Sequence, residues 1–259
     1  MDPAGIIGLV LAFGAIIGSM VMEGGNPMAI IAPPALVLIF VGTTGACMAG
    51  NTIPTTIGAV KWLIFGLTAK KPDMDAVVEP LVKMAEKARR EGLLALESEM
   101  ESISDPFMKK GLQMAVDGTD PDDLFEILAA EVKSKKAAAA IGIGFWTDAG
   151  GYSPTIGIIG TVLGLVHVLE NLSQPDKLGH LIAGAFIATL WGVLSANVMF
   201  LPWGKRIKNV VAMEAARMEL IIDGVLAIQA GANPRVVASK LQSKMIATGP
   251  GGNAAKEAA

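Results

Sequence analysis

The chain has few of the side chains on which most catalytic and metal sites depend. It contains one cysteine, Cys47, and two histidines, His167 and His180, among 259 residues. A single cysteine excludes an internal disulfide and a cysteine-based metal cluster, and the two histidines do not have metal-ligand spacing. No nucleophile elbow, Walker loop or other catalytic motif is present. The sequence therefore predicts a protein that is not an enzyme and has no cofactor.

Charged side chains are missing from long stretches of the chain. Residues 61–140 hold 12 of the 21 Lys and Arg residues and 15 of the 24 Asp and Glu residues, and most of the rest lie in 204–259. A hydrophobic share of 52% and a mean hydropathy of +0.53 are too high for an ordinary soluble domain and indicate several membrane spans. The net charge of -3 argues against a nucleic-acid partner.

The apolar stretches predict four membrane spans that form two hairpins. We expect spans at 3–22, 28–48, 154–172 and 180–203, short turns at 23–27 and 173–179, and a Gly-rich break at 147–152. The start of the first span has no Lys or Arg before it, so we expect it to be retained and not cleaved as a signal peptide. The segment between the second and third spans shows helical pieces and no strand-like alternation. The predicted fold class is therefore an all-α integral membrane protein with a large helical insert.

Four domains follow from this pattern. They are a transmembrane hairpin at 1–52, a cytoplasmic helical insert at 53–150, a second hairpin at 151–204, and C-terminal helices with a disordered tail at 205–259. Basic residues cluster beside the spans on the insert side and after the fourth span, whereas the two short turns carry only Lys177. By the positive-inside rule, the insert and both termini are expected in the cytoplasm.

The third and fourth spans carry rows of small residues at helical spacing. The rows are Gly157, Gly160 and Gly164 in the third span, and Gly184, Ala188, Gly192 and Ala196 in the fourth. Small residues let helix backbones approach closely where lipid supplies no hydrophobic drive. Two interpretations stay open: the rows pack these two spans against each other, or they form a wall around a space that other helices fill.

Three threonines are the polar groups in or entering these spans: Thr155, Thr161 and Thr189. A lone Thr in a membrane helix usually bonds its own backbone. Thr161 and Thr189, however, both lie mid-span beside the small residues, where two hydroxyl oxygens can face a dehydrated cation or a water chain. The interiors of the spans carry no charged side chain, so an ion path would need a partner's carboxylate. Near the outer end of the third span, Glu170 and His167 either guide cations or are merely solvated.

The insert contains a charged stretch at 87–101. An apolar stripe of Leu93, Leu96, Met100 and Ile103 predicts one buried side, which leaves Arg89, Arg90, Glu97 and Glu101 exposed. A solvated helical face is the default interpretation of such charges, and a docking surface is the alternative.

Several motifs of the chain resemble a known family, the A subunit of the flagellar motor stator of the MotA/PomA type, within the MotA/TolQ/ExbB proton-channel superfamily. The matching motifs are Arg89-x-x-Gly92 with Leu96-Glu97, Ser153-Pro-Thr-x-Gly157 continuing to Gly164, Ala188-Thr189-x-x-Gly192, and Asn197-x-x-Phe200-x-Pro202. The small-residue core alone would also fit an ExbB/TolQ-like energiser of an envelope process. The paired hairpins and the Arg89…Glu97 insert favour the stator. A scaffold whose small residues only pack helices is a third alternative.

The resemblance implies an ion-conducting subunit in the bacterial inner membrane, which couples inward Na⁺ or H⁺ flow to torque in flagellum-dependent motility. It implies a partner of the MotB/PomB type, with one transmembrane helix and a peptidoglycan-binding domain, which supplies the ion-binding carboxylate. It further implies a homo-oligomeric ring in lipid, a pentamer around a partner dimer, and contact with the rotor switch protein FliG. Because residue 161 is a threonine, the resemblance favours Na⁺ over H⁺ as the transported ion.

The resemblance also implies roles for individual residues. It assigns rotor contact to Arg89 and Glu97, with Arg90, Glu99 and Glu101 as weaker candidates, conformational coupling to Pro154 and Pro202, and the ion path to Thr155, Thr161 and Thr189.

Overall fold

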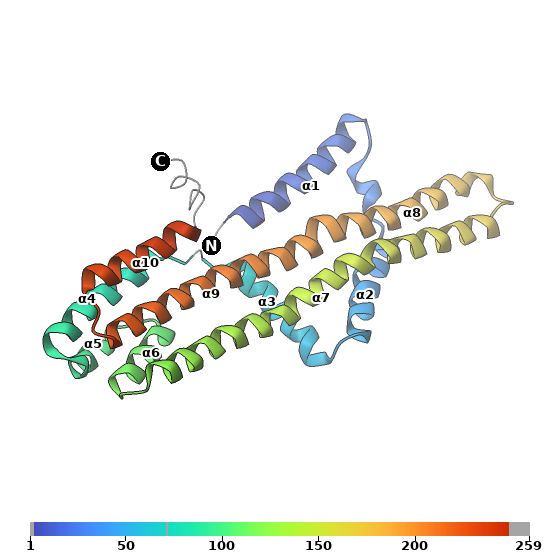
Figure 1. Ribbon diagram of the computed structural model, residues 1–259. Helices are drawn as coiled ribbons and strands as arrows, with labels where there is room; N and C mark the ends of the chain where they lie inside the picture. The colour runs from blue at the N-terminus through green and yellow to red at the C-terminus, as the bar shows by residue number, and fades with distance from the viewer. Residues whose placement is uncertain (1–2, 71, 249–259) are drawn as a thin grey trace. The chain divides into compact units, whose positions relative to one another are not determined.

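The computed structural model describes residues 3–70 and 72–248, and the regular elements in that part are all helical (Figure 1). The predicted all-α fold is confirmed. The chain divides into two compact units, one formed by 1–70 with 138–210 and the other by 71–137 with 211–259. Two long helices, α7 (Pro121–Glu170) and α9 (Leu201–Gln229), contribute residues to both units. The end of the chain, which was predicted to be a disordered tail, lies outside the described residues from 249 onward.

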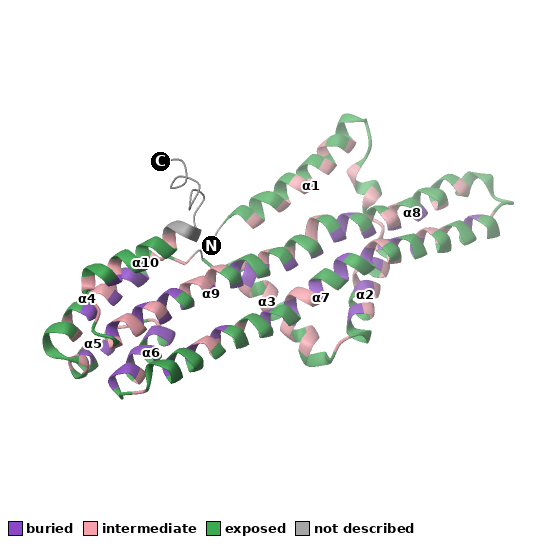
Figure 2. Cartoon of the chain, in the orientation of Figure 1, coloured by how far each residue is buried: buried purple, intermediate pink, exposed green. Residues whose placement is uncertain are grey.

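The first unit contains the apolar helices. Besides parts of α7 and α9, it comprises α1 (Ala4–Met22), η1 (Pro27–Ile30), α2 (Pro33–Ala49), α3 (Ile53–Thr68), α8 (Pro175–Leu194) and the π segment η3 (Ser195–Phe200). Within the described residues, three helices are long and apolar enough to cross a membrane: α1, α7 and the continuous Pro175–Gln229. Helix α1 has no buried residue (Figure 2), as expected for a helix that contacts lipid. The count of four spans stays a prediction.

The predicted second span is interrupted. The 3₁₀ turn η1 ends at Ile30, and α2 begins only at Pro33, so α2 is a shorter apolar helix. Pro33 and Pro34 occupy the first turn of α2, where their missing N–H groups would be unpaired in any case. The indole N–H of Trp191 donates to the Ile30 carbonyl oxygen at 2.7 Å and ties η1 to α8.

The Gly-rich break predicted at 147–152 is wrong, because α7 runs through it without interruption. The hydrogen-bonding pattern stays helical, and Gly150 lies so close to Leu201 that a Cβ atom would overlap that side chain. Here the glycine permits a close approach and does not end the helix. The predicted turn at 173–179 is also too long: α8 begins at Pro175, since proline suits the first turn of a helix.

The π segment η3 joins α8 to α9 without a break. The Leu201 N–H bonds to the carbonyl of Ala196, five residues earlier, which is the π-helical pattern. The sequence analysis predicted a span ending at 203 and a separate amphipathic helix after it; the observed helix continues from Pro175 to Gln229.

The second unit has an apolar core of its own. It comprises α4 (Asp75–Glu91), η2 (Leu93–Leu96), α5 (Glu97–Met100), α6 (Pro106–Val116), parts of α7 and α9, and α10 (Pro234–Thr248). Fully buried side chains from several of these helices, among them Leu81, Leu112, Leu128 and Ile221, form one cluster. Burial of these side chains stabilises the unit by the hydrophobic effect.

Candidate functional site

Helices α7 and α8 bring Thr161 and Thr189 into contact within the first unit. Their hydroxyl groups are hydrogen-bonded to each other. The Thr161 Oγ1 also lies 3.1 Å from the Ala185 carbonyl oxygen and 3.2 Å from the Gly157 carbonyl oxygen. The Thr189 Oγ1 lies 3.3 Å from the same Gly157 carbonyl oxygen. Both side chains are half-buried. Thr155 is not part of this pair: it is exposed, and its hydroxyl bonds the Tyr152 carbonyl of its own helix at 2.7 Å.

The small residues produce very close contact between α7 and α8. A Cβ atom on Gly192 would lie 2.7 Å from the Ser153 carbonyl oxygen and 3.0 Å from the Gly157 Cα. A Cβ atom on Gly157 would lie 3.0 Å from the Ala188 carbonyl oxygen, and Gly160 and Gly164 face Ala188 and Ala185 as closely. These residues therefore pack the two helices together. Gly184 differs, because nothing lies within 4 Å of its added Cβ, and Ala196 is buried.

A second hydroxyl pair, which the sequence analysis did not single out, lies between α7 and the start of η3. Ser153 and Ser195 are both fully buried, and their Oγ atoms are 2.7 Å apart. Ser153 Oγ lies 3.0 Å from the Gly192 carbonyl oxygen, and Ser195 Oγ lies 2.7 Å from that of Trp191. The signal in the sequence was weak: Ser195 is one of three polar residues in an apolar run, with Thr189 and Asn197.

Pro154 and Pro202 lie beside this second pair in the chain. Pro154 stands inside α7, directly after Ser153. Pro202 is the second residue of α9, and Leu201 separates it from the end of the π segment. A proline inside a helix removes one backbone hydrogen bond and weakens the helix at that point.

A cavity of about 740 Å³ opens beside α7 and α8 near His167 and His180. It is lined mainly by apolar residues of η1, α2, α7 and α8, including Leu38, Leu163 and Gly184. No carboxylate lines it, and the described residues contain no group of three or more His, Cys, Asp or Glu able to hold a metal ion. Glu170 is exposed, and its Oε2 atom lies 3.3 Å from the Nδ1 atom of His167.

The residues predicted to contact the rotor form a charged surface on the second unit: Arg89, Arg90, Glu97, Glu99 and Glu101. Four of them are exposed, and Glu99 is half-buried and pairs with Lys87 at 2.7 Å. Gly92, with a φ of 87°, turns the chain between α4 and η2, a conformation that favours glycine. Leu96 and Met100 are buried and anchor the segment, as the apolar stripe predicts.

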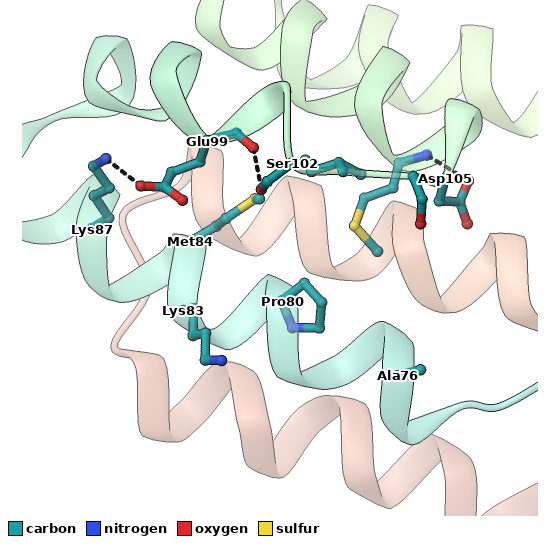
Figure 3. A pocket seen from close by; sticks show the side chains of 11 residues that line it. Ala76, Pro80, Lys83, Met84, Lys87, Glu99, Ser102 and Asp105 are labelled. Carbon is teal, nitrogen blue, oxygen red and sulfur yellow. Dashed lines mark hydrogen bonds and ion pairs between the residues drawn. The ribbon is translucent and has the colours of Figure 1, made fainter.

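A pocket of about 530 Å³ lies next to this charged surface (Figure 3). Lys87 extends from α4 to Glu99, while Met84, Met108 and Ile103 provide apolar lining. The pocket therefore combines an apolar lining with charged groups of both signs.

A network of partly buried charges joins three helices of the second unit. Arg217 on α9 forms ion pairs with Asp105 and, at 2.7 Å, with Glu214, which also pairs with Lys135 on α7 at 3.0 Å. Asp105 caps α6 by accepting hydrogen bonds from the N–H groups of Phe107 and Met108. Burial raises the pKa of Glu214, but hydrogen bonds from Arg217 and Lys135 outweigh it, so the pKa is lowered overall.

Comparisons with known proteins agree with this architecture. Residues 6–92 match the motility protein A N-terminal model, and residues 99–220 match that of the MotA/TolQ/ExbB proton channel family. The chain is 36% identical to motility protein A of Bacillus subtilis over 245 residues, which cover 93% of this chain and 90% of that one. It is 34% identical to the chemotaxis protein PomA of Vibrio alginolyticus over 243 residues, 94% of this chain and 95% of that one.

Solved structures give the same result. C. jejuni MotAB superposes with a TM-score of 0.91 at 30% identity, covering 96% of this chain and 98% of that one. The flagellar MotAB stator complex of Bacillus subtilis superposes with a TM-score of 0.84 at 35% identity. The match covers 91% of this chain and 93% of that one. From its apolar helices, its small-residue contacts and these matches, the chain belongs to the motility protein A group of the MotA/TolQ/ExbB proton channel family.

Proposed function

We propose that this chain is the ion-conducting subunit of a bacterial flagellar motor stator, which couples inward Na⁺ or H⁺ flow to torque on the rotor. The observation that carries the proposal is the Thr161–Thr189 pair on two closely packed apolar helices. The matches to motility proteins over more than 90% of the chain support it. The match of 6–92 to the motility protein model favours the stator over an ExbB/TolQ-like energiser of the envelope.

The ion-binding carboxylate comes from a partner. Residues 181–201 and 154–166, which form the helices around the threonine pair, contain no charged side chain, and an ion path through lipid needs one. The MotAB complexes among the similar structures support a single-span partner of the MotB type. We place five copies of this chain around a partner dimer in the inner membrane, each with four spans and with both termini in the cytoplasm.

In this mechanism the ion passes between α7, α8 and the partner's helix. The loaded and the empty carboxylate interact differently with the threonine hydroxyls, and this difference drives one step of the ring. Pro154 and Pro202 lie at points of weakened helix geometry and let the helices adjust. The charged surface then acts on the rotor switch protein FliG.

The function is tested in flagellated cells from which the A subunit has been deleted and which therefore do not swim. Expression of this chain together with its partner should restore rotation, and the chain alone should not. Restoration of an envelope transport process without rotation would refute the proposal in favour of the energiser.

The ion itself requires a separate experiment. Thr161 supplies a hydroxyl oxygen of the kind that coordinates Na⁺, so we expect Na⁺ in preference to H⁺. Swimming speed should rise with external Na⁺ at constant pH. A speed that is independent of Na⁺ and that collapses with the proton gradient would assign H⁺.

A further inference from the structure

The buried Ser153–Ser195 pair has more hydrogen-bond contacts than protons to fill them. Three contacts are 3.0 Å or shorter: Ser153 to Ser195 at 2.7 Å, Ser195 to the Trp191 carbonyl at 2.7 Å, and Ser153 to the Gly192 carbonyl at 3.0 Å. A fourth, from Ser195 to the Gly192 carbonyl, is longer at 3.2 Å. Two hydroxyl groups contribute two protons. Two of the four contacts therefore lack a proton at any moment.

Two arrangements keep the bond between the hydroxyl groups and use only the three shorter contacts. In the first, Ser153 donates to Ser195, and Ser195 donates to the Trp191 carbonyl. In the second, Ser195 donates to Ser153, and Ser153 donates to the Gly192 carbonyl. They differ only by rotation of the two hydroxyl groups, and each leaves one carbonyl of α8 without a proton on its shortest hydroxyl contact.

The pair is located where the backbone can respond to such a change. The Ser195 N–H is shared between the Gly192 and Trp191 carbonyls, so neither has a full helical hydrogen bond of its own. Ser195 is also the first residue of the π segment, and π segments are commonly associated with functional sites. On the other helix, Pro154 follows Ser153 and has no N–H to donate.

The same contacts connect the pair to the threonines. Gly192 packs against Gly157 and the Ser153 carbonyl, and a Cβ atom on Gly157 would lie 3.2 Å from the Thr189 Cα. The Gly157 carbonyl oxygen in turn lies within hydrogen-bond distance of both threonine hydroxyls. Because contact is this close, a shift at Gly192 changes the geometry of the Thr161–Thr189 pair.

We propose that Ser153 and Ser195 are positioning residues for ion coupling, whose hydroxyl groups switch between these two arrangements and move α8 against α7. The inference rests on the proposed stator function, since loading of the partner carboxylate beside the threonines would bias the switch. The first arrangement strengthens hydrogen bonding inside α8, and the second ties α8 to α7 at Gly192.

Each alanine variant removes a different arrangement. Ser153→Ala leaves Ser195 with the Trp191 carbonyl as its nearest acceptor, at 2.7 Å against 3.2 Å for the Gly192 carbonyl, and Ser195→Ala leaves Ser153 with the Gly192 carbonyl alone. In the reconstituted complex with its partner, ¹³C NMR of these two carbonyls should therefore shift in opposite directions in the two variants. In each variant the shift should be complete, because one of the two arrangements is abolished. Carbonyl signals that shift in the same direction, or not at all, would overturn the switch.

A matched pair of variants separates the hydroxyl from simple packing. Thr and Val have the same shape, so Ser195→Thr and Ser195→Val add equal bulk while only the first retains a donor. Rotation speed at equal ion flux should be higher in Ser195→Thr, and equal speeds would refute a role for the hydroxyl. If the unsubstituted chain itself drives no rotation, the stator function fails, whereas the NMR experiment still decides whether the switch exists.

Discussion

At the scale of single residues, the Thr189 hydroxyl is hydrogen-bonded between two packed helices and is still partly accessible from the proposed ion path. It bonds Thr161 and lies near the Gly157 carbonyl, yet the side chain is only half-buried. An exposed threonine such as Thr155 bonds only its own helix. The position of the hydroxyl between two helices, and not the residue type, distinguishes the two cases.

Replacing Thr189 by Val should reduce ion flux while leaving membrane insertion intact, because Val has the same shape and no hydroxyl. We expect a fall of about five-fold, the effect of one lost hydrogen bond, measured as ion uptake into vesicles that contain the complex. Thr147→Val is the control, since the exposed Thr147 bonds only the Ile143 carbonyl of its own helix. Normal motility of the Thr189 variant would count strongly against the ion-path role.

Arg217 is the residue on which the charge network of the second unit depends. Arg217→Met leaves Asp105 and Glu214 partly buried with less compensation, so stability should fall by about 3 kcal/mol. Lys83→Met is the matched control, because the Lys83–Glu79 pair is 72% and 71% exposed and is screened by solvent, so its loss should change stability far less. Denaturation of the purified complex measures both, and equal losses would mean that the network adds nothing.

The same network predicts a dependence of stability on pH. The folded state lowers the pKa of Glu214, so its contribution is fully present above the ordinary pKa of a glutamate. It is lost as the pH falls through the lowered, folded-state pKa. Acid titration of unfolding should therefore show a steeper loss of stability in the unsubstituted chain than in Glu214→Gln, and identical acid profiles would contradict the prediction.

At the scale of elements, the contact between α7 and α8 determines which glycines matter. The rows of small residues looked equivalent in the sequence, but Gly192 touches the backbone of α7 and Gly184 faces open space. Helices in lipid associate largely through such packing. The separation of α7 from α8 is therefore set by the glycines in contact and not by the whole row.

Gly192→Ala should destabilise the helix pair, whereas Gly184→Ala should not. The added methyl group on Gly192 meets the Ser153 carbonyl oxygen at 2.7 Å, and overpacking of this kind costs about 1–3 kcal/mol. The Gly184 change removes a flexible residue from a helix and should be neutral or slightly stabilising. Thermal unfolding in detergent compares the two, and equal behaviour would show that α7 and α8 do not pack as described.

At the scale of the whole molecule, ion conduction and torque are assigned to different compact units. The threonine pair lies in the first unit and the charged surface in the second, while α7 and α9 contribute to both. Such a division predicts that conduction and torque can be impaired separately.

Reversing the charge of Arg89 should lower torque without changing ion conductance, because the side chain is exposed on the second unit. Lys109→Glu is the control, an exposed charge outside the charged surface. Tethered-cell rotation measures torque, and vesicle uptake measures conductance. If conductance falls in parallel with torque, Arg89 has a structural or gating role instead.

Much of this molecule could be predicted from local pattern. The apolar runs and the exposed charges at Arg89 and Glu97 depend on composition and helical periodicity, which are properties of neighbouring residues in the chain. The motif from Ser153 to Gly164 placed the important small residues correctly on one helix.

Only the tertiary structure decided how those residues are used. The glycines at 147–152 resemble a helix break in sequence, yet packing against Leu201 keeps α7 continuous. Likewise, Ser195 and Ser153 are 42 positions apart, so nothing local indicates that their hydroxyl groups are hydrogen-bonded. Backbone proximity between helices is a property of three-dimensional packing, and for that reason the sequence determined the kinds of helices present while the fold determined their pairing.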